Sequence, residues 1–126
     1  MNSYDITYQL VDSPINESKP GGTIAADRLI EAFQGFPFAE EVKKAETMKD
    51  GAATFPTITF RRKSDGEEIA IWTDNASRFD LCFVHGGRKK FLNSQSKEEV
   101  EAILNRFQTE SVLAIQPRSF WSRIFG

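Results

Sequence analysis

The fold is decided by residues 55–92, which read FPTITFRRKSDGEEIAIWTDNASRFDLCFVHGGRKKFL. Four runs of β-forming residues, at 55–62, 67–73, 78–85 and 88–92, are separated by short groups of turn residues. Apolar and polar side chains alternate in the first three runs, as in strands that place one face on a core. The stretch therefore predicts an antiparallel meander.

The residues before the meander predict one more strand and two helical segments. Residues 4–10 alternate between large apolar and polar side chains, which is typical of a strand. Residues 12–22 are rich in Pro, Gly and Ser, so we expect a mobile connecting loop. Thr23 suits the N-cap of a helix over residues 23–34, and Pro37 suits the start of the next.

A further helix follows the meander. Residues 96–99, Ser-Lys-Glu-Glu, have the form of a capping box, and an apolar stripe continues to Phe107. Helices on one face of the sheet would give an α+β two-layer sandwich with a mostly antiparallel sheet. We expect residues 1–117 to form a single domain and residues 118–126 an aromatic and basic C-terminal tail.

Composition excludes several classes of protein. With 126 residues, 16 basic and 18 acidic side chains and a net charge of −2, the chain is too balanced for a dedicated nucleic-acid or membrane-surface protein. Cys82 is the single cysteine, which excludes an internal disulfide framework. The first residues show neither the basic leader nor the apolar run typical of a signal peptide, and no apolar run approaches the ~20 residues that span a bilayer. We expect a cytoplasmic protein without stable membrane insertion.

The strand alternation predicts a polar second face on the sheet. We expect this face to carry Thr7, Gln9, Thr57, Thr59, Arg61, Glu68, Ala70, Trp72, Asp80, Cys82 and Val84. Trp72 is the residue best suited to anchor a partner, because tryptophan is enriched among interface hot spots. The alternative is that the tail or the loop at 12–22 covers it.

A meander also brings the turns near residues 64 and 86 to one end of the sheet. Residues 61–63, which include Arg61, would then stand beside residues 88–90, which include Arg88 and Lys89. This basic rim could meet an acidic protein or phosphates, or nearby carboxylates could neutralise it as an ordinary solvated hairpin end.

The sequence offers one candidate set of catalytic residues, Asp80, Cys82 and His85. They would supply a carboxylate, a thiol and an imidazole. Cys82 and His85 are three positions apart, so a regular strand points them to opposite faces of the sheet. One His, one Cys and dispersed carboxylates match no zinc spacing. We therefore expect no catalytic residue, no metal and no cofactor.

The tail carries four large apolar residues, among them Phe120 and Trp121, which alternate with Arg and Ser. These side chains cannot all lie comfortably in water. The tail would dock on its own domain, bind a partner or lie on a membrane surface.

The stretch from residue 55 to 107, with its strands EEIAIW and FDLCF and its closing helix SKEEVEAILNRF, resembles the small bacterial immunity proteins that neutralise polymorphic toxins. The resemblance is one of size and element order. It implies a non-catalytic cytosolic protein that binds one cognate toxin tightly and blocks or distorts its active site.

The expected function is thus direct binding of a protein partner, without nucleic acid and with no oligomeric state specified. The residues expected to contact it are Trp72, Arg61, Glu68, Asp80, Arg88, Lys89, Phe120 and Trp121. The alternatives are a chaperone or adaptor for a secreted effector, a small enzyme that uses Cys82 or His85, and a nucleic-acid binder that uses the basic rim.

Overall fold

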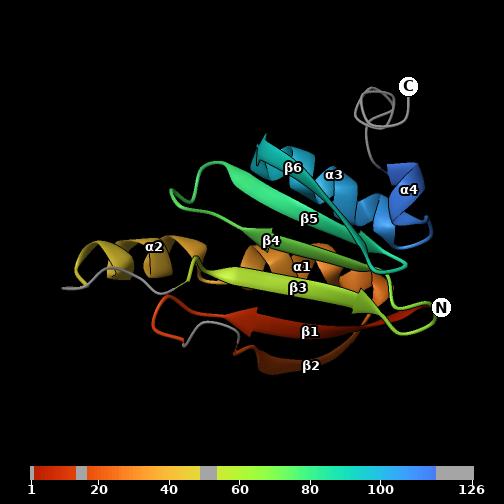
Figure 1. Cartoon of the computed structure of the whole chain (residues 1–126), viewed down its shortest axis with the longest axis horizontal. Coiled ribbons are helices and arrows are strands. Elements are labelled where there is room, and N and C mark those ends of the chain that lie inside the picture. Colours follow the sequence, from red (N-terminus) through yellow and green to blue (C-terminus); the bar gives the residue numbers. More distant parts are fainter. Residues whose placement is uncertain (1, 14–16, 49–53, 116–126) are drawn as a thin grey trace.

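Six strands form one antiparallel sheet in the order β2-β1-β3-β4-β5-β6 (Figure 1). The structure, a computed structural model, describes residues 2–13, 17–48 and 54–115. The strands are β1 (Ser3–Gln9), β2 (Lys19–Ala25), β3 (Thr57–Arg62), β4 (Glu68–Trp72), β5 (Phe79–His85) and β6 (Arg88–Gln95). The helical elements are the 3-10 turn η1 (Ala26–Arg28), α1 (Leu29–Gly35), α2 (Phe38–Glu46), α3 (Lys97–Phe107) and α4 (Val112–Ile115).

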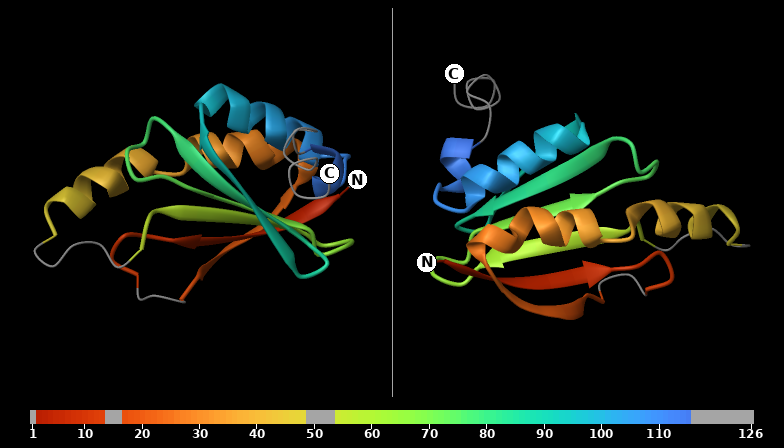
Figure 2. Two further views of the ribbon diagram at one scale, coloured as in Figure 1. Left: turned by 45° about the horizontal axis from the view of Figure 1, so that its top comes forward. Right: turned by 180° about the vertical axis from the view of Figure 1, so that it is seen from behind.

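The helices lie on one side of the sheet, and the opposite face carries no helix among the described residues (Figure 2). We call the helix-free side the open face. The α+β two-layer sandwich with an antiparallel sheet is confirmed. None of the described helices combines the length and the hydropathy needed to cross a bilayer.

The core lies between the sheet and the helices. Its largest side chains are almost completely buried, and they include Ile58, Phe60, Ile69, Ile71, Leu81 and Phe83 from the strands and Leu29, Phe33, Val100, Leu104 and Phe107 from the helices. The alternation of the sequence therefore identified the buried face correctly. Phe33, Phe38 and Phe79, three of the eleven phenylalanines of the chain, form a cluster of rings with centroids 5.1–5.6 Å apart.

The loop predicted for residues 12–22 and the helix predicted from Thr23 are wrong in part. Residues 19–25 form the edge strand β2, and the helical region begins only at Ala26. Thr23 does not cap a helix, because its Oγ1 donates a hydrogen bond across the sheet to Asp5 Oδ1 at 2.8 Å. Pro and Gly have low strand propensity, so β2 depends on backbone pairing with β1. Gly21 is required there, since a Cβ would lie 2.8 Å from the Ile6 Cγ2 atom.

The predicted capping box is present at the start of α3. Ser96 Oγ accepts a hydrogen bond from the Glu99 amide, and a Glu99 carboxylate oxygen accepts one from the Ser96 amide, both at 3.1 Å. The hydrogen bond from the Ser96 amide is the main reason that the pKa of the Glu99 carboxyl is lowered. Strand β6 extends to Gln95, beyond the predicted end at residue 92, and α4 was not predicted.

Candidate functional site on the open face

An aromatic pair dominates the open face. Trp72 on β4 lies opposite Asp80 of β5, and Phe91 on β6 lies opposite Cys82 of β5. The two rings meet edge to face with centroids 6.1 Å apart. Because β5 separates β4 from β6, the rings meet above β5 and bridge it. We call Trp72 and Phe91 the aromatic pair.

The two rings differ from the rest of the sheet in exposure. Phe91 is 51% exposed, Trp72 is partly exposed, and Cys82 on the strand between them is only 7% exposed although it faces the open side. The sequence singled out Trp72 and missed Phe91. The signal was available, because the Gly86-Gly87 turn sets residue 91 opposite residue 82, on the polar face already assigned.

Most predicted charges of this face are engaged within the sheet. Arg61 Nε lies 3.9 Å from Glu68 Oε1, and Asp80 Oδ1 accepts a hydrogen bond from the Ser94 amide at 2.9 Å. Lys89 differs, because it is exposed and no carboxylate of the described residues lies within 4.0 Å of its ammonium. Lys89 is therefore an exposed cation of this face without an ion-pair partner among the described residues.

The basic rim is smaller than predicted. The antiparallel order does bring both turns to one end of the sheet, but Arg62 is only 4% exposed and lies on the helix side. Lys63 Nζ lies 3.8 Å from Asp5 Oδ1. Arg88 pairs with His85 and so shares the helix side with it, which separates Arg88 from the aromatic pair.

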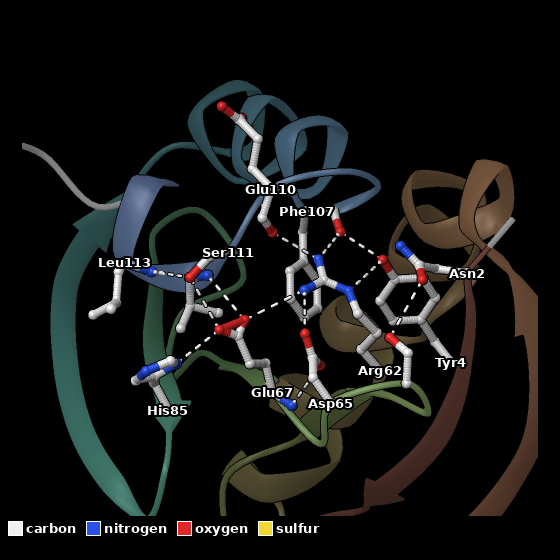
Figure 3. Close-up of polar contacts among 12 residues, drawn as sticks. Asn2, Tyr4, Arg62, Asp65, Glu67, His85, Phe107, Glu110, Ser111 and Leu113 are labelled. Carbon is white, nitrogen blue, oxygen red and sulfur yellow. Dashed lines mark hydrogen bonds and ion pairs between the residues drawn. The ribbon is translucent and has the colours of Figure 1, made fainter.

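The buried Arg62 guanidinium joins the sheet to the end of α3 (Figure 3). It donates to the backbone oxygens of Phe107 at 2.5 Å and Glu110 at 2.6 Å, to the Tyr4 hydroxyl at 3.2 Å and to Asp65 Oδ2 at 3.1 Å. Its Cζ atom also lies 4.4 Å from the centroid of the Phe107 ring. A charge that is buried is stable only with such partners, so this cation has a structural role.

Glu67 is the anionic partner of Arg62 and is 5% exposed. Its Oε2 atom lies 3.3 Å from Arg62 Nη1 and accepts the Val112 amide at 3.2 Å. Its Oε1 atom accepts the Ser111 hydroxyl at 3.0 Å and lies 2.7 Å from His85 Nδ1 (Figure 3). The carboxylate thus holds the start of α4 against the ends of β4 and β5. We call Arg62, Glu67 and their partners the polar network.

The catalytic set suggested by the sequence is not assembled. Cys82 lies beside Ala70 and Phe91 on the open face, whereas His85 contacts Glu67 on the helix side. The prediction that the thiol and the imidazole point to opposite faces is confirmed. Asp80 is on the face of the thiol, but its Oδ1 atom accepts the Ser94 amide. Within the described ranges, no group of three or more His, Cys, Asp or Glu side chains could hold a metal ion.

The sequence also predicts two segments that could cover Trp72, the loop at 12–22 and the C-terminal tail. Residues 19–22 lie in β2, and β1 and β3 separate that strand from β4, so this part of the predicted loop does not cover the indole. Phe120 and Trp121 of the tail lie outside the described residues.

No protein-family model, curated protein or solved structure matches the chain. The open face and the polar network are therefore the features that bear on function.

Replacement of Arg62 by methionine tests the polar network. Arg62→Met should lower the free energy of unfolding by about 3–5 kcal/mol, because it leaves the buried Glu67 carboxylate without its cation. The matched control is Arg61→Met, which removes an exposed cation from the same strand and should cost less than about 1 kcal/mol. Urea unfolding measures both values, and equal losses would show that Arg62 is an ordinary surface cation.

Burial by the aromatic pair also has a chemical consequence for Cys82. Burial raises the pKa of the Cys82 thiol, while nearby Lys89 opposes that shift. Alkylation requires the thiolate, so iodoacetamide at neutral pH should modify the native chain at least about tenfold more slowly than the urea-unfolded chain. The rate in the native chain should rise only as the pH passes above the ordinary thiol range.

Trp72→Ala should accelerate this alkylation in the native chain, because it removes one of the two rings beside Cys82, whereas Leu113→Ala on α4 should not change it. Mass spectrometry follows the modification. A native thiol that reacts as fast as the unfolded one would contradict the assigned cover.

Proposed function

We propose that the chain is a non-catalytic binding protein that neutralises a cognate protein toxin by direct contact through the open face. The observation that carries this proposal is an aromatic pair, with Phe91 exposed and Trp72 partly exposed, on a helix-free sheet face whose other side chains are mostly polar. That the partner is a protein toxin is inferred from the resemblance to bacterial immunity proteins.

The geometry of the aromatic pair suits protein binding. Trp72 and Phe91 extend from β4 and β6, on either side of β5, and their rings meet edge to face, so each ring limits the rotation of the other. Large rings with few rotatable bonds contribute much contact area at low cost in conformational entropy, which is why aromatic residues are frequent hot spots. Ordering of these two side chains would therefore cost little free energy when a partner binds.

The reactive side chains favour binding over catalysis. The Cys82 thiol is buried and has a raised pKa, which disfavours the nucleophilic thiolate. The His85 imidazole and the Ser111 hydroxyl both contact Glu67 Oε1. A serine nucleophile would need the imidazole as its base, so this arrangement supports a structural role for both groups.

The test uses a toxin encoded beside the gene of this protein in its native genome. Trp72→Ala and Phe91→Ala should each weaken binding by about 10- to 100-fold, since hot-spot truncation costs roughly 1.4–2.7 kcal/mol. Isothermal titration calorimetry measures the affinity, and survival of cells that express the toxin reports neutralisation.

Leu113→Ala and Phe55→Ala are the matched controls, because both residues are large, apolar and about half exposed but neither belongs to the aromatic pair. Both variants should bind the toxin as the unaltered chain does. The proposal fails if the controls weaken binding as much as Trp72→Ala, or if Trp72→Ala binds normally.

A further inference from the structure

We propose that the partner supplies an extended strand that pairs with the free edge of β6, with a carboxylate beside Lys89 and an apolar side chain beside Phe91. This inference rests on the proposed function, because it specifies how a partner engages the open face. The segment that pairs with the edge of β6 is an acidic segment of another protein.

The two edges of the sheet differ in their ability to accept a strand. On β2, Pro20 has no amide hydrogen, the register shifts between Ile6 and Thr7, and Gly22 has a φ of +88°. Proline and bulges are devices that prevent strand addition at an edge. On β6, pairing with β5 is regular from Arg88 to Leu92, and no described strand pairs with its outer side. Strand addition is therefore favoured at β6.

The turn between β5 and β6 decides which backbone groups face outward. Gly86 and Gly87, with φ of 55° and 81°, form a two-residue turn that His85 and Arg88 close. Residues that close such a turn exchange hydrogen bonds, and the next pair along an antiparallel ladder does not. The amide and carbonyl groups of Lys89 therefore point away from β5, and by the same alternation so do those of residue 91.

The same two residues carry the open-face side chains of this strand. Lys89 lies opposite Val84, and Phe91 lies opposite Cys82. An added strand would hydrogen-bond to these two residues and place its own side chains directly beside theirs, because paired residues share a face. At Lys89 and Phe91, the backbone hydrogen bonds would thus provide affinity and the two side chains would provide selectivity.

Charge selects the partner. Lys89 is exposed and has no carboxylate of the described chain within 4.0 Å, so an acidic side chain opposite it would form a new ion pair. A second copy of this chain fits less well. Antiparallel pairing of two β6 strands about Phe91 would place Lys89 opposite Asn93, which is neutral. The expected partner strand therefore alternates an acidic and an apolar residue on one face.

Two synthetic peptides test this pairing with the full chain. In one, Glu and Phe alternate with Thr, and in the other Lys replaces Glu. The Glu peptide should slow hydrogen exchange at the Lys89 and Phe91 amides at least about tenfold at saturation, and amides of β2 should not change. The Lys peptide should bind at least about tenfold more weakly.

Lys89→Glu should reverse the preference between the two peptides. The matched control is Lys19→Glu, which makes the same charge change on the opposite edge strand and should leave the preference as it was. NMR spectroscopy measures the exchange of each amide. Sedimentation of the chain without peptide measures self-association.

Three results would overturn the inference. The first is that these amides are not protected at about 1 mM Glu peptide, a concentration that reveals even weak binding. The second is that the two peptides bind equally well, and the third is that self-association alone protects the same amides. With the cognate toxin, normal binding by Lys89→Glu and lost binding by Trp72→Ala would reject strand addition and keep the proposed function. Normal binding by both variants would reject both.

Discussion

Strand register is the constraint on which both faces of this protein depend. Side chains alternate with a period of two, so a slip by one residue would exchange the core and solvent faces of a strand. The Gly86-Gly87 turn, in which both residues have positive φ, fixes the register of β6 against β5. The exposed positions of Phe91 and Lys89 follow directly from that turn, and the proposed binding surface depends on them.

The polar network joins the helices α3 and α4 to the end of the sheet. At the end of β3, the alternation that places Ile58 and Phe60 in the core also directs Arg62 inward. The cation lies between rings and backbone oxygens at the end of α3, and Glu67 satisfies the start of α4. The network thus joins α4 to the sheet. It also engages the His85 imidazole, which a catalytic mechanism would have needed as its base.

The sequence predicted the elements that carry a strong periodicity and missed those held by tertiary contacts. The meander, its buried face and the capping box at Ser96 were predictable, because each depends on neighbours in the sequence. Strand β2 was not, since its Pro and Gly content resembles a loop and only pairing with β1 makes it a strand. The sequence predicts Arg62 to be part of an exposed basic rim, because the partners that bury it lie up to 58 residues away in the chain. Phe91 could have been found from the two-residue turn.

Cross-saturation NMR on the complex with the proposed toxin partner tests the central claim most directly, because it maps the contact surface without any substitution. Irradiation of the toxin should attenuate the amide signals of β4, β5 and β6, with the largest loss near Trp72 and Phe91. Attenuation centred on α1, α3 and α4, with the signals of β4 to β6 unchanged, would contradict the claim that this protein binds through the helix-free face of its sheet.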